Sequence, residues 1–172
     1  MLVKIFLIGF MGAGKTYLGK QLAKKLNIPF IDTDEWIEKQ QGQNIAGIFS
    51  KEGENAFRLM EHEAILKCCE MPSAVVSCGG GLPCYFNHMD LMRENGTVIY
   101  IQMDPDTLLT RMIRNEIRQR PLLSGKTETE LHDWILEKIQ EREPHYLKAH
   151  HTIRGDCLKP EDLMILLSAR HS

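Results

Sequence analysis

Short apolar runs alternate along the chain with longer segments in which apolar residues recur at helical spacing. The run at 3–8 is β-branched and apolar apart from Lys4, which is typical of a central strand in a parallel sheet. After it, Leu18, Leu22 and Leu26 fall on one face of a helix. This alternation also predicts strands at 29–32, 74–78, 97–102 and 152–153, and helices beginning near residues 15, 35, 53, 86, 105, 131 and 160. It indicates one α/β domain over residues 1–172, with a parallel sheet covered by helices on both faces.

The composition is that of a globular protein and narrows the classes of partner. Of the 172 residues 43% are hydrophobic and 26% charged, with a net charge of −2. No global field favours nucleic acid or an anionic membrane surface, and we expect neither as a partner. The apolar start MLVKIFLIGF is too short to span a bilayer and lacks a signal-peptide cleavage site. The five cysteines contain no C-x-x-C pair and fit reduced thiols, so we expect a cytoplasmic protein.

Residues 9–16 match the P-loop pattern G-x-x-x-x-G-K-[ST] in full, as Gly9-Phe10-Met11-Gly12-Ala13-Gly14-Lys15-Thr16. Backbone N–H groups of such a turn point at phosphate oxygens, and the following helix adds the positive end of its dipole. Lys15, on a loop that we expect to face solvent, can reach the β- and γ-phosphates, and the Thr16 hydroxyl can bind magnesium. The motif follows a predicted strand and opens a predicted helix. It therefore predicts binding of a nucleoside triphosphate.

Two carboxylates, Asp32 and Asp34, stand where the second predicted strand ends. In an extended chain their side chains share one face and Thr33 points the other way. The carboxyl ends of the strands form the ligand crevice of a doubly wound sheet, where the pair suits a magnesium contact and a contact to a hydroxyl-bearing acceptor. Alternatively, Asp34 only caps the following helix. The residues alone leave both interpretations open.

Arginines 58 and 142 are candidates for binding an anionic substrate. Arg58 lies three residues before Glu61, so the two can form an ordinary exposed ion pair, or Arg58 can point into the crevice and hold a carboxylate or phosphate. The spacing does not decide between these. Arg142 lies on the apolar face of its helix, between Ile139 and Tyr146, where it needs an anionic partner unless it extends to solvent. For Arg142 we favour an anionic ligand.

A polar segment over residues 115–127 lacks steady periodicity and contains Pro121 and Gly125. Four arginines lie in it or just before it: Arg111, Arg114, Arg118 and Arg120. Such a run of charge is usually a solvated surface. A kinase, however, needs a mobile lid that covers the γ-phosphate and excludes water. Because the chain carries a P-loop, we expect a lid here.

These features together resemble one family, the shikimate kinases, which belong to the nucleoside-monophosphate-kinase-like P-loop group. The resemblance runs from about residue 3 to about residue 160. Beyond the P-loop, its signals occur in the family's order: Asp32-Thr33-Asp34, Phe57-Arg58 with Glu61, Gly79-Gly80-Gly81, Arg120-Pro121-Leu122-Leu123, and Arg142 with Tyr146. As in that family, no Walker-B aspartate ends the third strand, which closes with Ser77 and Cys78.

The resemblance implies substrate and metal roles for the matching residues. Asp34 is expected to bind the shikimate hydroxyls and to accept the proton of the attacking one. Asp32 is expected to hold magnesium together with Thr16. Arg58 and Arg142 are expected to grip the shikimate carboxylate, in a pocket that Gly80 and Gly81 also line.

The resemblance also implies nucleotide roles. Arg120 is expected to meet the transferring phosphoryl group, which makes it catalytic together with Lys15 and Asp34. An arginine that stacks on adenine falls near Ile113, so either Arg111 or Arg114 takes that role, with Arg114 as the working assignment. The remaining nucleotide contacts are expected from Gly12, Ala13, Gly14, Lys15, Thr16 and Tyr17, although Tyr17 is bulkier than the small residue expected there and should face away from the phosphates.

The expected activity is transfer of the γ-phosphoryl group of ATP to the 3-hydroxyl of shikimate, with Mg²⁺, by a monomer. The expected fold is the P-loop kinase fold: a five-stranded parallel sheet, a helical substrate-binding insert over residues 33–69 and a lid over residues 112–127. One alternative is a related kinase of another small hydroxy acid such as gluconate, which would not need Arg58 and Arg142 to converge. Another is a nucleotide-dependent switch, which would need a Walker-B aspartate and a guanine-specificity motif that we do not find.

Overall fold

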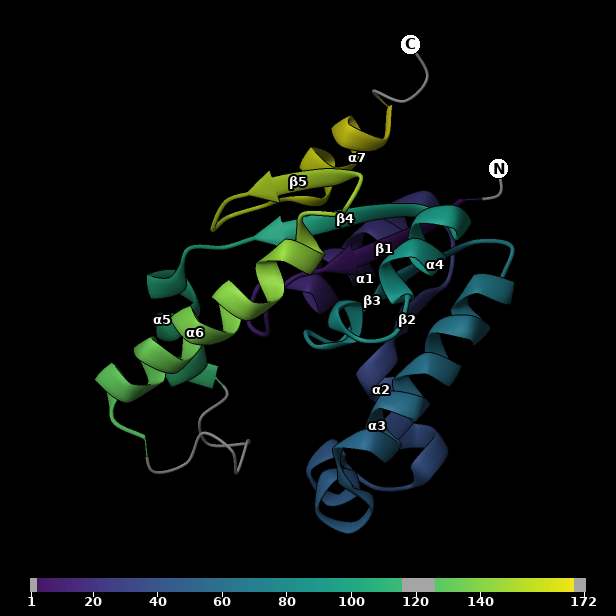
Figure 1. Ribbon diagram of the computed structural model, residues 1–172. Helices are drawn as coiled ribbons and strands as arrows, with labels where there is room; N and C mark the ends of the chain where they lie inside the picture. The colour runs from purple at the N-terminus through teal and green to yellow at the C-terminus, as the bar shows by residue number, and fades with distance from the viewer. Residues whose placement is uncertain (1–2, 116–125, 169–172) are drawn as a thin grey trace.

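The computed structural model of the chain describes residues 3–115 and 126–168 and contains a parallel sheet covered by helices (Figure 1). Within these residues the sheet has five strands in the order β2-β3-β1-β4-β5, and every neighbouring pair is parallel. The strands are β1 Lys4–Ile8, β2 Phe30–Asp32, β3 Ala74–Ser77, β4 Thr97–Gln102 and β5 His151–Arg154. This architecture confirms the predicted fold class.

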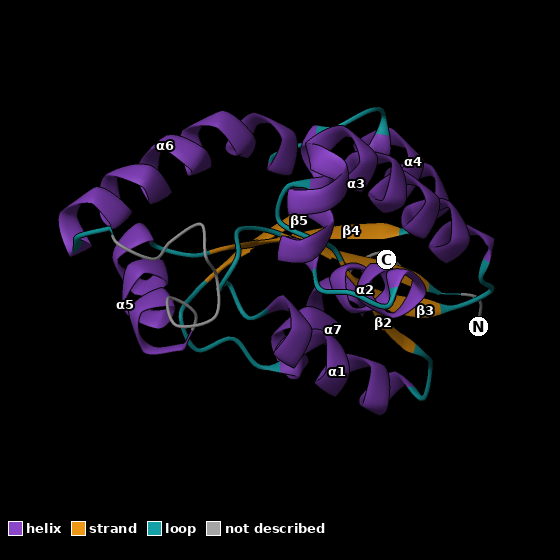
Figure 2. Ribbon diagram, turned by 90° about the horizontal axis from the view of Figure 1, so that it is seen from below, coloured by secondary structure: helices purple, strands orange, loops and turns teal. Residues whose placement is uncertain are grey.

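Helices connect the strands and lie on both faces of the sheet (Figure 2). They are α1 Lys15–Leu26, α2 Thr33–Gln41, α3 Ile45–Glu70, α4 His88–Asn95, α5 Pro105–Asn115, α6 Glu128–Tyr146 and α7 Pro160–Ser168, with a short 3₁₀ helix η1 at Leu82–Cys84. Helices α1 and α7 cover one face, and α3, α4 and the end of α6 cover the other. None of the described helices is long and apolar enough to cross a membrane.

Strand β1 shows why the two faces form separate cores. Successive side chains of a strand point to opposite faces, and every residue from Ile5 to Ile8 is fully buried. Ile5 and Leu7 pack toward α1, with Leu18 and Leu22, whereas Phe6 and Ile8 pack on the opposite face, among residues of α3 and α4. A strand that is apolar on both faces is the pattern of a buried parallel strand, as the sequence predicted.

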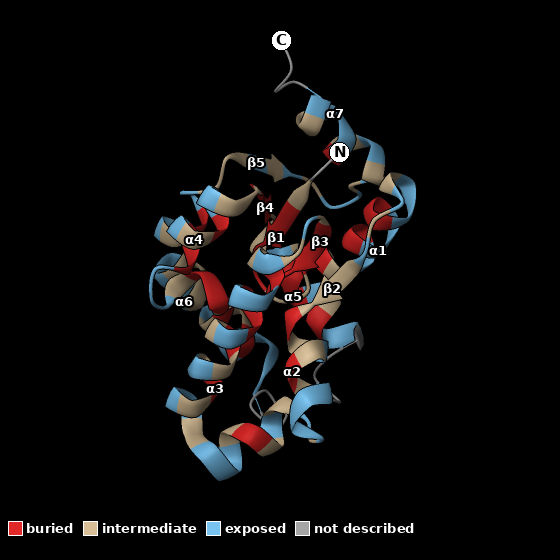
Figure 3. Cartoon of the chain, turned by 90° about the vertical axis from the view of Figure 1, so that its right-hand side faces the viewer, coloured by how far each residue is buried: buried red, intermediate tan, exposed pale blue. Residues whose placement is uncertain are grey.

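A third, smaller core joins α2 to α3 at the end of the molecule away from α7 (Figures 1 and 3). It contains Ile37 of α2 and Ile48, Phe57 and Ala64 of α3. No separate helix was predicted before Gly53. In the structure α3 already begins at Ile45, and Asn44 provides its N-cap. Gly53 has a non-helical backbone (φ 81°, ψ 173°), so it separates this segment from the predicted long helix.

The first residues of the predicted lid, 112–115, belong to helix α5. Helix α5 ends at Asn115, and α6 begins at Glu128 after a capping box formed by Thr127 and Glu130. Residues 116–125, which include Arg118 and Arg120, lie outside the described residues. The predicted role of Arg120 therefore stays a prediction.

Candidate active site

The P-loop follows β1 and leads directly into α1, as its sequence predicted. Gly14 is the N-cap of α1 and has no side chain that could cap the helix, and no acidic residue lies in the first helical turn. The N–H groups at the start of the helix and the helix dipole therefore suit an anion. The expectation that Lys15 faces solvent is wrong, because this residue is only 8% exposed. Its Nζ donates hydrogen bonds to the carbonyls of Gly9 and Phe10, both at 2.8 Å.

Thr16 and Asp32, the two residues predicted to hold magnesium, lie in contact. The Thr16 hydroxyl donates to Asp32 Oδ2 at 2.7 Å and lies 3.4 Å from Ser77 Oγ. Hydroxyl and carboxylate oxygens are the donors that Mg²⁺ prefers, so these residues fit the ion. Among the described residues no group of three His, Cys, Asp or Glu side chains could hold a metal ion.

The extended arrangement predicted for Asp32-Thr33-Asp34 is wrong, because α2 already begins at Thr33. Asp32 is the N-cap of α2, and its Oδ1 accepts from the backbone N–H groups of Asp34 and Glu35 at 3.1 and 3.4 Å. Capping is thus the role of Asp32, and the alternative that Asp34 only caps the helix is excluded. Asp34 instead stands in the first helical turn.

The start of α2 contacts the glycine turn that follows β3. The Thr33 hydroxyl accepts a hydrogen bond from the Gly79 N–H at 2.9 Å. A Cβ atom on Gly79 would lie 2.5 Å from Asp34 Oδ1 and 3.1 Å from Glu61 Oε1, so only glycine leaves room for both carboxyl groups. Asp34 and Glu61 therefore meet across Gly79, at the carboxyl edge of the sheet.

Arg58 and Glu61 form a buried ion pair beside this turn. The pair is therefore not the ordinary exposed ion pair that their spacing also allowed. Arg58 Nη1 donates to Glu61 Oε2 at 2.7 Å, and the two side chains are only 12% and 2% exposed. The guanidinium packs against Gly81, where an added Cβ would come within 2.8 Å of Nη1. Burial raises the pKa of Glu61 to about 7, against the opposing effect of Arg58.

Arg142 of α6 reaches the same turn from the side of the P-loop. Its Nη1 lies 3.5 Å from where a Gly80 Cβ would stand, and its guanidinium carbon lies 5.5 Å from the ring centroid of Phe10. One helical turn later, the Tyr146 hydroxyl donates to the Gly80 carbonyl. Arg142 also lowers the pKa of Glu61, although burial and Arg58 act on that group more strongly. Its side chain therefore borders the crevice, as an anionic ligand requires.

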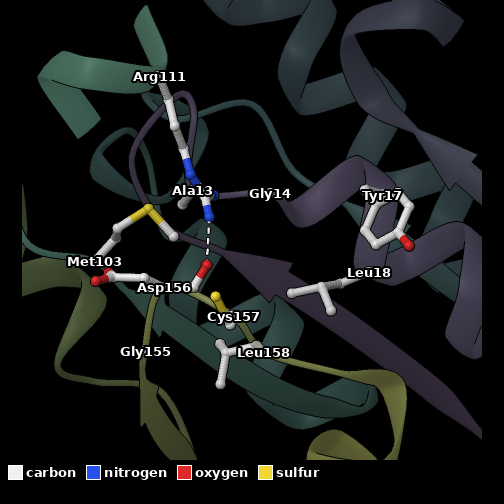
Figure 4. A pocket seen from close by; sticks show the side chains of 10 residues that line it. All are labelled: Ala13, Gly14, Tyr17, Leu18, Met103, Arg111, Gly155, Asp156, Cys157 and Leu158. Atoms are coloured by element: carbon white, nitrogen blue, oxygen red, sulfur yellow. Dashed lines mark hydrogen bonds between the residues drawn. The ribbon is translucent and has the colours of Figure 1, made fainter. Parts of the chain in front are cut away.

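A cavity of about 200 Å³ adjoins the P-loop (Figure 4). Ala13, Gly14, Tyr17 and Leu18 form one wall, and Met103, Arg111 and residues 155–158 form the rest. Arg111 donates to the carbonyls of Gly12, at 3.2 Å, and of Asp156. Arg114 is exposed and does not line the cavity. Of the two arginines considered for the base, Arg111 thus lines the cavity and Arg114 does not.

Three parts of the site carry no role in the sequence-based assignment. Glu61 was noted only as a neighbour of Arg58, and Thr33 only as a spacer between two aspartates. Residues 155–158 were missed, although they follow the carboxyl end of β5, the edge at which doubly wound sheets bind their ligands. That topological rule was the available signal for them.

A P-loop at the carboxyl edge of a parallel sheet, facing a crevice with two arginines and two carboxyl groups, defines a P-loop kinase of a small molecule. The family model for shikimate kinase matches residues 11–168. The chain therefore belongs to the shikimate kinase family. Family membership does not favour the gluconate-kinase or nucleotide-switch alternatives.

Known relatives agree in sequence and in structure. The shikimate kinase of Bacteroides thetaiotaomicron is 40% identical over 158 residues, which cover 92% of this chain and 90% of that protein. A crystal structure of shikimate kinase from this organism superposes with a TM-score of 0.91 at 38% identity, covering 96% and 98% of the two chains. A shikimate kinase from Acinetobacter baumannii in complex with shikimate gives a TM-score of 0.89 at 30% identity, covering 100% and 97%.

Proposed function

We propose that this ATP-dependent shikimate kinase transfers the γ-phosphoryl group of ATP to the 3-hydroxyl of shikimate, giving shikimate 3-phosphate and ADP on the route to chorismate and the aromatic amino acids. One observation carries the proposal. Arg58 and Arg142 come from helices far apart in sequence, and both meet the Gly79–Gly81 turn next to the P-loop. Two guanidinium groups beside the carboxyl groups of Asp34 and Glu61 suit a substrate that carries a carboxylate and hydroxyl groups.

ATP would lie along the P-loop, with its base in the cavity beside Arg111. The N–H groups at the start of α1 would bind the phosphates. The Lys15 ammonium already lies inside the loop, near the carbonyls of Gly9 and Phe10, where it can follow the β- and γ-phosphates. Arg120, from the lid, is proposed to stabilise the charge on the transferring group.

Thr16 and Asp32 would hold Mg²⁺, Asp32 through water. When bound, the ion neutralises charge on the phosphate oxygens. Asp32 also caps α2, so the same carboxylate fixes both the ion's position and the direction from which Asp34 enters the crevice. A shift of Asp32 would therefore disturb the nucleotide and the acceptor together.

Shikimate would be held by its carboxylate between Arg58 and Arg142, with Gly80 and Gly81 against its ring. Asp34 would orient the 3-hydroxyl and accept its proton. The oxygen of that hydroxyl forms a bond to the γ-phosphorus, while the bond from the γ-phosphorus to the β,γ-bridging oxygen breaks and ADP leaves. Because the protein forms no covalent bond, catalysis rests on positioning and on charge stabilisation.

We further propose that the enzyme acts as a monomer in the cytoplasm. All of the groups assigned to the reaction come from one chain, so the site needs no second copy. ATP as co-substrate and five cysteines without a disulfide fit a reducing, ATP-rich compartment. Sedimentation at working concentration tests the first statement, because a stable dimer would contradict it.

The decisive assay couples ADP formation to a readable signal and offers shikimate, gluconate and other hydroxy acids in turn. Of these acids, we expect only shikimate to be turned over efficiently. Phosphorus NMR of the product should locate the phosphate on the 3-oxygen. Turnover with gluconate but not with shikimate would refute the proposal. Phosphate on another shikimate hydroxyl would refute the assignment of Asp34.

A further inference from the structure

Tyr85 lies directly against Arg58, although it belongs to no sequence signal discussed above. The centre of its ring is 4.0 Å from the guanidinium carbon of Arg58, the geometry of a cation–π contact. Tyr85 follows η1, and its backbone N–H donates to the Leu82 carbonyl at 3.4 Å. The residue is thus tied to the segment that begins with the glycine turn.

The hydroxyl of Tyr85 adds a second link to Arg58, through Glu54. It donates to Glu54 Oε1 at 2.8 Å. The same oxygen accepts from Arg58 Nη2 at 2.8 Å and from Nε at 3.2 Å. The pKa of Tyr85 is raised, mainly by burial and then by this hydrogen bond, so the phenol keeps the proton that it donates.

The guanidinium of Arg58 is therefore hydrogen-bonded to two carboxylates, and it packs against Gly81 and the Tyr85 ring. Its hydrogen bonds to Glu54 and Glu61 use three of the five N–H groups, those of Nε, Nη2 and Nη1. Within the described part of the chain these bonds leave one N–H on each Nη, which is the number that a bidentate carboxylate needs. Gly81 and the Tyr85 ring restrict how far the guanidinium can turn.

We propose that Tyr85 is a positioning residue that fixes the orientation of Arg58 for the substrate carboxylate. The inference rests on the proposed function, because it assigns that carboxylate to Arg58. Tyr85 acts through Arg58 and has no part in phosphoryl transfer itself. Its loss should therefore weaken shikimate binding and leave ATP binding and the chemical step nearly unchanged.

Steady-state kinetics of two Tyr85 variants test this. Tyr85→Leu removes the ring contact and the hydrogen bond to Glu54, and should raise the KM for shikimate by about 10-fold with little change in kcat or in the KM for ATP. Tyr85→Phe keeps the ring contact, so its KM should rise by only about 2- to 3-fold. Phe86→Leu is the matched control: Phe86 is the next residue, and its ring contacts His62 and His88.

The dependence on Arg58 needs a double variant. If Tyr85 acts through Arg58, Tyr85→Leu should add little to the KM increase already caused by Arg58→Lys. An unchanged KM in Tyr85→Leu, or the same 10-fold increase on top of Arg58→Lys, would overturn the inference while leaving the shikimate kinase activity intact. Inactivity of the native protein toward shikimate would instead overturn the proposed function, and this inference with it.

Discussion

Replacing Glu61 by Gln should change how the stability of the fold depends on pH. Glu61 is 1% exposed, and its burial raises the pKa from 4.5 to about 7, with Arg58 opposing and Asp34 adding to the shift. The pKa of Glu61 is thus higher in the folded protein than in the unfolded chain, so protonation of this carboxyl favours the folded state. This contribution to the free energy of unfolding is fully present below about pH 4.5 and is lost as the pH rises through about 7. Raising the pKa from 4.5 to about 7, at about 1.4 kcal/mol per pKa unit, corresponds to about 3–4 kcal/mol.

Urea unfolding of the native protein and of Glu61→Gln, from about pH 5.5 to about pH 8.5, measures this effect. The free energy of unfolding of the native protein, relative to the variant, should fall by about 2 kcal/mol over this range. Glu54→Gln is the control: hydrogen bonding to Arg58 lowers the Glu54 pKa, so this carboxylate stays ionised throughout the range and its difference should be flat. A flat difference for Glu61→Gln would refute the reasoning, because Arg58 would then outweigh burial.

Three further substitutions test the nucleotide side of the site. Lys15→Ala should abolish most turnover at saturating ATP, and near-native turnover would contradict the role of Lys15. Because Lys15 donates hydrogen bonds to two P-loop carbonyls, the variant should also have a free energy of unfolding lower by about 1–3 kcal/mol. Arg111→Ala should raise the KM for ATP several-fold and Arg114→Ala should not, in the same kinetic assay; the reverse order would restore Arg114 as the base contact. Arg120→Ala should lower kcat by about 10³-fold with little change in shikimate affinity, and an equal change in both would indicate a general charge effect.

The strands of the sheet could be predicted because each carries a local signal, whereas their order in the sheet was not predicted. Strand β4 was predicted with its observed ends, and α1 ends at Leu26 before Asn27, whose backbone is left-handed. The segment from Ile45 to Gly53 was missed because it is short and is held by distant contacts, with α2 and with Phe57 beyond Gly53, in the small core around Ile48. Its helical state depends on those tertiary contacts, which periodicity does not reveal.

The site could be predicted in composition but not in geometry. The motifs named Asp34, Arg58 and Arg142, and the structure brings all three to the glycine turn. The error at Asp32 arose because an aspartate at a strand end can continue the strand or cap a helix, and only the observed hydrogen bonds decide. The position of Tyr85 depends on the turn of η1 and has no local signal at all.

The proposed function requires that Arg58 and Arg142 bind one substrate carboxylate. Calorimetric binding of shikimate, and of the analogue whose carboxylate is reduced to an alcohol, tests it most directly with the native protein, Arg58→Lys and Arg142→Lys. An exposed arginine of α4 gives the control, Arg93→Lys. Each charge-assisted contact contributes about 1.5–3 kcal/mol, so each Lys variant should lose about 10- to 100-fold in affinity for the acid.

The alcohol should bind the native protein weakly and should be nearly indifferent to either substitution, because it offers no charge to the guanidinium groups. ATP binding measured without shikimate should stay unchanged in both variants, and Arg93→Lys should behave as the native protein does. If the native protein instead binds acid and alcohol equally well, no carboxylate clamp exists and the assigned roles of Arg58 and Arg142 are wrong.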